Sequence, residues 1–352
     1  MNTSQPKQFA TKKLGAISRK AISVSQESLI KTQQIKPGNL LPLLVEPTIE
    51  GLNLVTWAEH NQHFIDSQIL WHGGLLFRNF KVDGISGFET FIKTIAGELL
   101  EYSFRSTPRS QVSGNIYTST EYPANQIIPQ HNEMSYSRSW SMKIAFHCIK
   151  KAEFGGETPI ADSHKVFNRI SSKTREKFIE KGVMYVRNYG RGIDLPWQNV
   201  FNTDSKSDVE NYCRQAGIDF EWKSNDGLRT SQVCQAVAQH PKTSQMVWFN
   251  QAHLFHISSL ETSIRQELLS SFKESDLPRN AYSGDGSAIE DDVLEEIRQA
   301  YQAETVIFPW KEGDVLLLDN MLATHGRLPF SGTRKVVVGM AEAFTGLTQR
   351  SP

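Results

Sequence analysis

The pattern of hydrophobic and polar positions divides the chain into a polar beginning and a long mixed remainder. The first 39 residues are rich in Ser, Gln and Lys, and the folded part is predicted to begin at the apolar run that starts at Leu40. Residues 53–68 carry apolar side chains at near-helical spacing, interrupted by the polar Asn61. The apolar run at 68–80, with Gly-Gly at its centre, predicts a turn that leads into a buried strand, and residues 87–100 predict a second helix.

From about residue 111 the pattern changes to short apolar runs divided by Gly, Pro and Asn. The expected strands lie at 141–149, 183–188, 230–237, 245–249, 314–319 and 335–340, and the expected amphipathic helices at 164–181, 258–275 and 288–302. Many short strands with helices in long insertions predict an α+β fold built on a β-sandwich or barrel. The stretch 190–228 mixes Gly, Pro, Asn and Asp with aromatic residues and is expected to form a lid or an active-site loop.

Composition and charge narrow the class of protein. Hydrophobic residues make up 39% of the 352-residue chain and the formal net charge is zero, which predicts a globular protein with a small-molecule partner and argues against a nucleic-acid binder. The three cysteines are too few and too scattered for a disulfide framework, which favours free thiols in the cytoplasm. No apolar run reaches the roughly 18 residues that a membrane span needs. We expect a flexible, basic arm at 1–39 and one domain at 40–352.

The segment that contains His131-Asn-Glu133 is the first candidate for chemistry. Residues i and i+2 of a strand point to the same face, so His131 and Glu133 are able to hold one metal ion together. The spacing by itself is weak, because a chain with 10 His produces about one such triplet by chance. An ordinary pair at the end of a strand is the alternative interpretation.

A second candidate segment runs from a strongly apolar strand to a loop with His325, and Arg334 follows before the next strand. Two histidines and one carboxylate form the facial triad of non-haem Fe(II) oxygenases, which leaves coordination positions open. A zinc hydrolase uses the same ligand types, although the helical His-Glu-x-x-His signature is missing. A third segment, 153–162, contains Gly-Gly at a point that suits a tight turn.

Together these segments resemble the taurine dioxygenase-like, clavaminate synthase-like superfamily of Fe(II)/2-oxoglutarate oxygenases, over roughly residues 40–345. The residues that carry the resemblance are Leu-Leu-Phe-Arg at 75–78, His131-x-Glu133, Gly-Gly-Glu-Thr-Pro-Ile-Ala-Asp at 155–162, Trp-Phe-Asn-Gln at 248–251, and Asp319-Asn320 through His325-Gly-Arg327 to Arg334. The sequences at 119–123 and 131–136 resemble those of the subgroup that contains the syringomycin-pathway aspartyl hydroxylase. Members of this subgroup modify amino acids, free or tethered to a carrier, in natural-product pathways.

The resemblance implies a double-stranded β-helix, or jelly roll, with flanking helices and long lid insertions. It also implies that His131, Glu133 and His325 bind Fe(II), and that Thr158 and Arg334 bind the distal carboxylate of 2-oxoglutarate. A guanidinium suits that carboxylate because it is planar and permanently charged. Glu in place of the more common Asp at 133 is a known variant in this superfamily, and it argues against a halogenase.

The function implied is a dioxygenase that hydroxylates an unactivated C–H bond of an amino acid, free or tethered to a carrier protein, while 2-oxoglutarate and O₂ yield succinate and CO₂. Desaturation, epoxidation and a small sulfonate or carboxylate substrate stay open. A Zn(II) hydrolase and a non-enzymatic jelly-roll binding module are the competing classes. The candidate substrate-binding residues are Asn115, Gln130, Tyr136, Asn250 and Arg327, each with a structural hydrogen bond as the alternative role. His147, His253 and His256 are predicted to be core or pocket-wall histidines.

Overall fold

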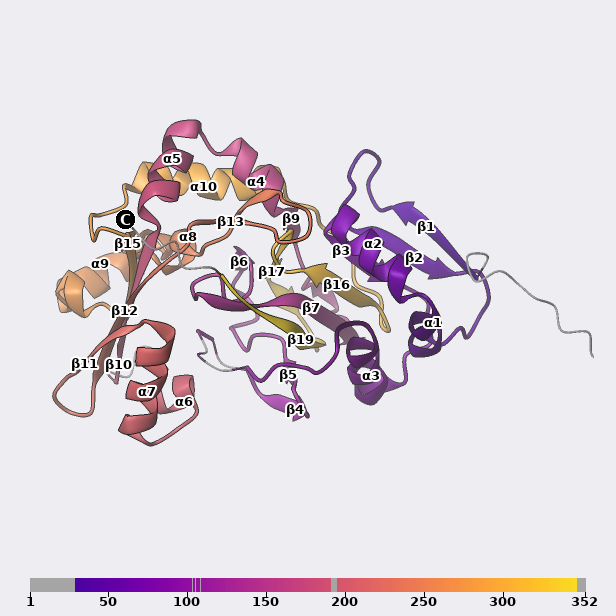
Figure 1. Ribbon diagram of the computed structural model, residues 1–352, viewed down its shortest axis with the longest axis horizontal. Coiled ribbons are helices and arrows are strands. Elements are labelled where there is room, and N and C mark those ends of the chain that lie inside the picture. The colour runs from indigo at the N-terminus through magenta and orange to yellow at the C-terminus, as the bar shows by residue number, and fades with distance from the viewer. Residues whose placement is uncertain (1–28, 103, 105, 108, 191–194, 347–352) are drawn as a thin grey trace, which may run out of the picture.

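The computed structural model describes residues 29–102, 104, 106–107, 109–190 and 195–346. Its centre is a large, mainly antiparallel sheet packed on a smaller one (Figure 1). The large sheet has the order β1 (Ile30–Gln34), β2 (Leu43–Pro47), β3 (Gly74–Phe77), β16 (Val315–Asp319), β7 (Ser139–Lys150), β19 (Lys335–Thr345), β5 (Ile116–Thr118) and β4 (Gln111–Ser113). The small sheet has the order β6 (Ile128–His131), β17 (Ala323–Arg327) and β9 (Ile160–Asp162). This pair of sheets confirms the predicted jelly-roll core.

Strand β16 explains why the large sheet is buried on both faces. Its residues alternate between two apolar clusters, because successive side chains in a strand point to opposite faces. Val315 and Leu317 pack with the helices on the outer face, whereas Leu316 and Leu318 pack between the sheets. A strand covered on both sides reads as a continuous apolar run, which is the pattern of its sequence.

Three helices cover the outer face of the large sheet. They are α1 (Leu54–His60), α2 (Gln62–His72) and α3 (Gly84–Ala96). The single helix expected at 53–68 is divided at Asn61, whose side chain donates to the carbonyl of Trp57 at 2.7 Å. The folded part also begins before the predicted boundary, because β1 pairs with β2. Residues 1–28 of the predicted arm lie outside the described residues, and the single domain at 40–352 stays a prediction.

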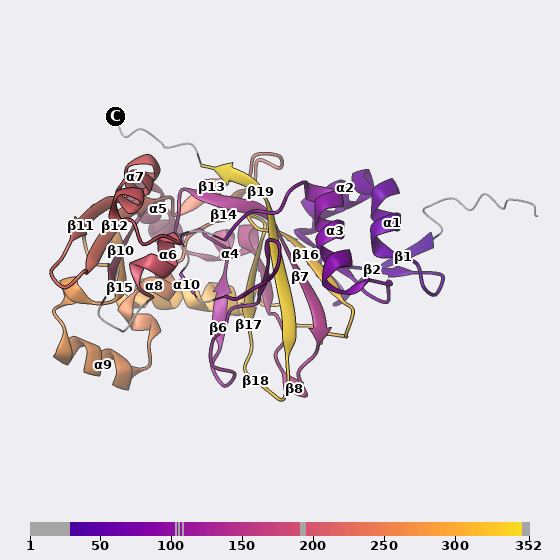
Figure 2. The same cartoon turned by 90° about the horizontal axis from the view of Figure 1, so that it is seen from below.

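The chain between β9 and β16 forms a second lobe beside the jelly roll (Figures 1 and 2). Its sheet has the order β11 (Asp219–Trp222), β12 (Leu228–Cys234), β10 (Val183–Tyr189) and β15 (Arg279–Ser283). The helices are α4 (Ser163–Arg169), α5 (Ser172–Lys181), α6 (Trp197–Phe201), α7 (Lys206–Ala216), α8 (Ala252–Phe255), α9 (Thr262–Ser271) and α10 (Asp291–Ala303), with short 3-10 turns at Ile257–Ser259 and Glu274–Asp276, and β13 (Val237–Gln239) pairs with β14 (Met246–Trp248). The stretch 190–228 therefore holds α6, α7 and β11 rather than an irregular active-site loop, while 191–194 lie outside the described residues. A role of this stretch as a lid stays a prediction.

Two further sequence predictions can be compared with the structure. The helix expected at 164–181 is two helices, because Ser171 begins α5 by accepting a hydrogen bond from the backbone of Thr174. The three cysteines are buried and free, as expected. In the part of the chain that the structure describes, none of the helices combines the length and the apolar character of a membrane span.

Candidate functional site

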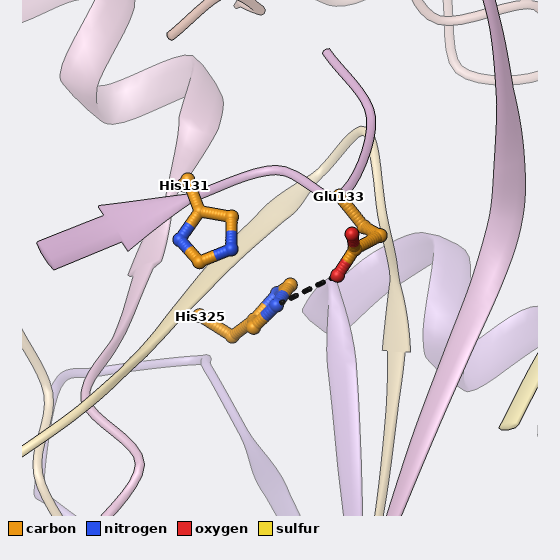
Figure 3. Close-up of side chains that lie close together, drawn as sticks. All are labelled: His131, Glu133 and His325. Carbon is orange, nitrogen blue, oxygen red and sulfur yellow. Dashed lines mark ion pairs between the residues drawn. The ribbon is translucent and has the colours of Figure 1, made fainter. Parts of the chain in front are cut away.

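Three side chains converge at the junction of β6 and β17. His131, Glu133 and His325 each offer one ligand atom, and these atoms lie within 4.8 Å of one another (Figure 3). Nε2 of His325 is 3.6 Å from Oε2 of Glu133, and the two imidazole rings are 4.5 Å apart between centroids. Two nitrogens and one carboxylate oxygen at this spacing are able to hold a divalent metal ion on one side only, which leaves the other side to further ligands.

Strand pairing brings the two histidines together although they are far apart in the sequence. In the antiparallel ladder between β6 and β17, His131 and His325 are direct cross-strand partners. Side chains of such partners start about 5 Å apart and point to the same face of the sheet. Phe146 of β7 packs on the ring of His325 at 5.0 Å between centroids and closes this side of the site to water.

Glu133 lies just beyond the end of β6, and Asn320 holds it there. The Asn320 side chain accepts a hydrogen bond from the backbone N–H of Glu133 at 2.7 Å and donates to the Glu133 carbonyl at 2.9 Å and to the Ser141 carbonyl at 2.8 Å. Asn132 donates in turn to the carbonyl of Asn320 at 2.6 Å. The turn after β16 and the turn after β6 are therefore joined by side-chain amides, which fixes the direction of the Glu133 carboxylate.

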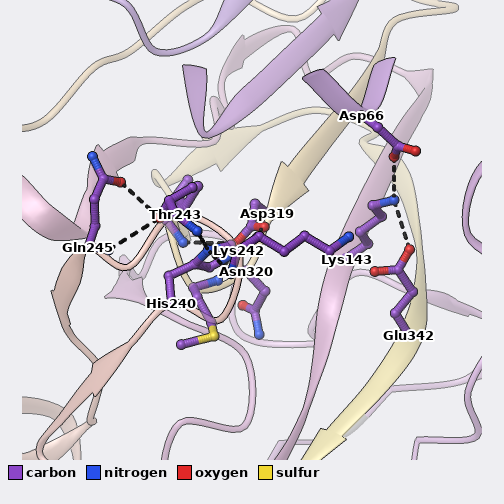
Figure 4. Close-up of polar contacts among 12 residues, drawn as sticks. Asp66, Lys143, His240, Lys242, Thr243, Gln245, Asp319, Asn320 and Glu342 are labelled. Atoms are coloured by element: carbon purple, nitrogen blue, oxygen red, sulfur yellow. Dashed lines mark hydrogen bonds and ion pairs between the residues drawn. The ribbon is translucent and has the colours of Figure 1, made fainter. Parts of the chain in front are cut away.

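A further network supports the turn that leads to His325. His240 accepts hydrogen bonds from two backbone N–H groups through Nδ1, so its hydrogen is on Nε2, which donates to Asp319 at 3.1 Å (Figure 4). The other oxygen of Asp319 accepts from the backbone N–H groups of Met321 and Leu322. Lys143, buried beside this region, pairs with Asp66 and Glu342 (Figure 4). These contacts make the β16–β17 connection rigid.

The electrostatics of the triad favour a bound cation. Burial opposes ionisation of Glu133, but the guanidinium of Arg109, whose Nη2 is 2.6 Å from Oε2 of Glu133, acts together with His325 and His131 and holds the carboxyl pKa well below its ordinary value. Burial and the neighbouring His325 lower the pKa of His131 to about 4, so this imidazole is neutral at neutral pH. A carboxylate and a neutral imidazole are the forms that bind metals.

Hydrogen bonding at the two imidazoles fits a metal ion. Nδ1 of His131 donates to the carbonyl of Pro129 at 2.9 Å, which fixes the tautomer and leaves Nε2 to the site. Both ring nitrogens of His325 are buried and have no hydrogen-bond partner among the described residues. Buried polar atoms are seldom left unpaired, so these nitrogens point to a ligand that the polypeptide does not supply. The donor set and the orphaned nitrogens therefore fit Fe(II).

A pocket opens beside the triad and contains the two predicted cosubstrate residues. It is lined by Arg109, Ser119, Thr120, Ile128, His131, Phe146, Thr158, His325, Gly326, Arg327 and Arg334. Nε of Arg334 donates to the Gly156 carbonyl at 2.9 Å and Nη1 donates to the hydroxyl of Ser119 at 3.1 Å, while Nη2 has no partner among the described residues. Burial and Arg327 lower the pKa of Arg334 to about 10, so it stays charged at neutral pH.

Thr158 complements Arg334 at the same end of the pocket. Its oxygen accepts a hydrogen bond from Nε1 of Trp310 at 3.1 Å, so the hydroxyl hydrogen remains free to donate to a ligand. A charged guanidinium with a free nitrogen and a hydroxyl donor together suit a carboxylate. The next residue, Lys335, is also basic but is exposed to solvent.

The structure gives the candidate substrate residues unequal support. Arg327 lines the pocket, although its guanidinium also donates to the carbonyls of three residues at 122–126. Gln130 is engaged at both ends, by Thr305 at 2.6 Å and by Thr324 at 2.9 Å. Tyr136 donates to the carbonyl of Phe104 and lines a second, separate cavity. For these residues a substrate role stays a prediction.

Asn115 and Asn250 do not line the pocket beside the triad. Asn115 donates to the Leu99 carbonyl at 2.9 Å, and Asn250 donates to the Ala236 carbonyl at 2.7 Å while it accepts from the N–H of Ala252. Their amides hold the backbone, because turns near strand ends leave carbonyls that need a donor. The substrate role predicted for both residues has no support in this geometry.

The sequence patterns predicted neither the contact of Arg109 with Glu133 nor the role of Asn320 in holding the Glu133 backbone. Arg109 lies next to no recognisable motif, and nothing local distinguishes it from the other arginines. Asn320 follows Asp319 at the end of an apolar strand, and two polar residues at that place were a sequence signal for a structural or functional role. His147, His253 and His256, the histidines predicted to lie in the core or in a pocket wall, are buried. Nδ1 of His147 contacts the Asp314 carbonyl, Nε2 of His253 the Gln130 carbonyl, and Nδ1 of His256 the Ser258 hydroxyl.

Comparisons with known proteins agree with this geometry. The profile of the family described as "Taurine catabolism dioxygenase TauD, TfdA family" matches residues 36–341. The dapdiamide synthesis protein DdaC of Enterobacter agglomerans is 42% identical over 292 residues, which are 83% of this chain and 89% of that protein. A clavaminate synthase-like protein of Arabidopsis thaliana is 30% identical over 292 residues, 80% of this chain and 85% of its own.

Solved structures share the fold at low sequence identity. The PvcB protein of Pseudomonas aeruginosa superposes with a TM-score of 0.54 at 14% identity, covering 90% of this chain and 93% of its own. AAD-2, solved with Mn(II) and N-oxalylglycine, superposes with a TM-score of 0.52 at 13% identity, covering 90% and 98%. The family match confirms the resemblance read from the sequence. The chain belongs to the TauD/TfdA family of dioxygenases, which use Fe(II), 2-oxoglutarate and O₂.

Proposed function

We propose that this dioxygenase hydroxylates an unactivated C–H bond of an amino acid, free or tethered to a carrier protein, in a natural-product pathway. The relative at 42% identity is named for dapdiamide synthesis, which supports a pathway of this kind. In the balanced reaction, O₂ gives one oxygen atom to the substrate as hydroxyl and the other to succinate, while 2-oxoglutarate loses CO₂. Bound Fe(II) supplies the oxidising chemistry.

The proposed metal ligands are His131, Glu133 and His325. The observation that carries the proposal is the convergence of their ligand atoms within 4.8 Å in a pocket that also holds Arg334. The backbone carbonyl of Pro129 keeps the hydrogen of His131 on Nδ1. Asn320 holds the backbone of Glu133, and Arg109 holds its carboxylate. A hydrolase or a non-enzymatic jelly roll has no need of an arginine in the same pocket as these ligands.

The proposed anchors of 2-oxoglutarate are Arg334 and Thr158. Nη2 of Arg334 and the hydroxyl of Thr158 are the two donors available for its distal carboxylate. The other end of 2-oxoglutarate then faces the metal ligands across the same pocket. Phe146 and the apolar side chain of Ile128 line the intervening wall and exclude water from it.

The cofactor assignment is tested by anaerobic absorption spectroscopy. Fe(II) and 2-oxoglutarate added to the protein should produce the visible metal-to-ligand charge-transfer band. His131→Ala should abolish the band, and Arg334→Gln should raise the 2-oxoglutarate concentration needed for it while Fe(II) still binds. A folded wild-type protein that gives no band would contradict the proposed cofactor set.

The substrate assignment is tested by a turnover screen. Free amino acids, and the same amino acids loaded on a carrier protein, are assayed for succinate release and for a product heavier by one oxygen atom. We expect one of the two series to couple succinate formation to this mass increase. A product lighter than the substrate by two hydrogen atoms would show that the enzyme desaturates rather than hydroxylates. Succinate release that is coupled only to a sulfonate substrate would contradict the proposed amino-acid substrate class.

A further inference from the structure

Arg109 is a buried arginine whose donors are mostly unused. Its side chain is 3% exposed, its guanidinium lies over the ring of Tyr102 at 4.6 Å, and Nη2 contacts Glu133 at 2.6 Å. Nε and Nη1 are both buried and have no hydrogen-bond partner among the described residues. A guanidinium carries five N–H donors, and buried donors are rarely left unpaired. These unused donors therefore point to a ligand that is not part of the chain.

The position of Arg109 identifies where that ligand would lie. Arg109 lines the same pocket as His131 and His325, whereas the proposed 2-oxoglutarate anchor there is Arg334. Nη2 of Arg109 contacts the proposed metal-binding carboxylate directly, so a group that binds the unused Nη1 beside it is close to the metal position. This is the part of the pocket in which a primary substrate must place its reacting carbon.

The charges around the pocket indicate that the missing ligand is an anion. Three arginines line the pocket, Arg109, Arg327 and Arg334, and the carboxylate within the triad is Glu133. Fe(II) and 2-oxoglutarate carry opposite double charges and cancel one another. Glu133 balances one arginine, so positive charge is left over in a site shielded from water, where an unbalanced charge is unfavourable. A substrate carboxylate offsets one of the two positive charges that remain.

We propose that Arg109 binds a carboxylate group of the primary substrate beside the metal, so that the enzyme selects substrates with a free carboxylate in the pocket. This inference rests on the proposed oxygenase function. The carboxylate has two sources: the α-carboxylate of a free amino acid, or the side-chain carboxylate of an acidic residue whose α-carboxyl is bound to a carrier. Both present the same planar anion to the guanidinium edge.

The test compares acids with their amides on the anaerobic Fe(II)/2-oxoglutarate complex. The probes are the proteinogenic amino acids, their α-carboxamides, and acidic amino acids with the side chain free or amidated. Binding is read from the shift of the charge-transfer band, at saturating Fe(II) and 2-oxoglutarate. The variants are Arg109→Gln, Arg109→Lys and, as a control, Arg265→Gln, which removes an exposed ion pair with Asp291 on the second lobe.

In the wild type, at least one acid should bind at least about tenfold more tightly than its matched amide, as expected for a charge-assisted hydrogen bond. The Arg109→Gln variant should still form the band but should lose this preference, because the acid should bind more weakly to it while the amide should bind as before. Arg265→Gln should keep it. If amidation of the α-carboxylate weakens binding, the α-carboxylate is the group that Arg109 binds. If amidation of the side-chain carboxylate weakens binding, it is the side-chain carboxylate.

Other outcomes would overturn the inference. If Arg109→Gln weakens Fe(II) binding but keeps the preference for the acid, Arg109 only positions Glu133. If the wild-type band forms but no acid shifts it more than its amide, Arg109 does not bind a substrate carboxylate, and this comparison needs no variant to fold. If the wild-type protein forms no band, the proposed function itself has failed.

Discussion

At the scale of single residues, Thr158 is the simplest anchor to remove. Thr158→Val keeps the shape of the side chain but deletes the hydroxyl that faces the pocket and accepts from Trp310. We expect the dissociation constant of 2-oxoglutarate to rise about three- to tenfold, the value of one hydrogen bond, with Fe(II) affinity unchanged. Thr174→Val, which deletes a hydroxyl bound to Glu296 in the second lobe, is the matched control. If both variants bind 2-oxoglutarate with the same affinity, Thr158 does not bind the cosubstrate.

Asn320 is predicted to act on the metal through Glu133. Asn320→Ala removes three hydrogen bonds and should cost about 1–3 kcal/mol of stability. It should also weaken Fe(II) binding by about tenfold or more, because the carboxylate loses its fixed direction. Isothermal titration with Fe(II) under anaerobic conditions measures the second effect.

Asn188 provides the control for this experiment. Its amide donates to the carbonyls of Ser275 and Leu277 in the second lobe, away from the triad. Asn188→Ala should lower the thermal stability without changing Fe(II) affinity. If both alanine variants bind Fe(II) like the wild type, Asn320 has only a structural role.

Some residues of the site were predictable from the sequence, and others were not. His131, Glu133 and His325 stand in motifs with recognisable order and spacing, so they were identifiable before the structure was known. Arg109 reaches Glu133 only through the folded chain, and no local pattern indicates that contact. The amide of Asn250 is an attractive substrate contact in the sequence, but the backbone around Ala236 uses it.

At the scale of secondary-structure elements, Gly156 connects a small two-stranded sheet to the proposed cosubstrate anchor. The strand β8 (Phe154–Gly155) pairs with β18 (Phe330–Ser331), and Gly156 follows at φ +75°. A Cβ atom at Gly156 would lie 2.9 Å from Cδ of Arg334, which is closer than side chains pack. Gly156→Ala should therefore displace Arg334 and weaken 2-oxoglutarate binding.

Gly286→Ala is the matched control for Gly156→Ala. Gly286 has φ +84°, but its added Cβ would meet only Cε of Met184, at 3.6 Å. Both variants carry the left-handed backbone cost of about 1–2 kcal/mol, so chemical denaturation should show similar losses. Only Gly156→Ala should raise the dissociation constant of 2-oxoglutarate. The same rise in the control would show that backbone strain, not contact with Arg334, is the cause.

Elements with a clear period were predictable, and their breaks were less so. The apolar run at 314–319 became β16, because a strand buried on both faces needs apolar residues throughout. The helix at 288–302 became α10 with its apolar side inward. The helices expected at 53–68 and 164–181 are each divided by a polar residue that binds backbone, a local competition that periodicity does not reveal.

At the scale of the whole molecule, buried histidines make the metal-free protein sensitive to acid. Burial lowers the pKa of His253 from 6.5 to about 3. The unfolded chain therefore takes up a proton that the folded state refuses as pH falls from 6.5, so stability drops by about 1.4 kcal/mol per pH unit for this group until pH reaches the folded-state pKa. His131 adds to the loss down to about pH 4.

His253→Gln is the variant that checks this dependence. Gln retains a donor for the Gln130 carbonyl but does not titrate. Urea unfolding at pH 7 and pH 5, without metal, should show a smaller loss of free energy in the variant than in the wild type. The same loss in both proteins would mean that His253 is already protonated in the folded state or stays neutral in the unfolded one.

The arrangement of the whole chain explains why its overall composition said little about the site. The cross-strand pairing of His131 with His325 requires both halves of the sequence to share one core. The zero net charge conceals three arginines around one pocket. Local charge, and not the sum over the chain, determines which cosubstrate and substrate the pocket accepts.

The most direct test of the central claim is anomalous diffraction from anaerobic crystals grown with Mn(II), in place of Fe(II), and 2-oxoglutarate. The account predicts one strong anomalous peak between His131, Glu133 and His325. It also predicts that the distal carboxylate of 2-oxoglutarate contacts Arg334 and Thr158. A peak at any other place, or a distal carboxylate away from Arg334, would contradict it.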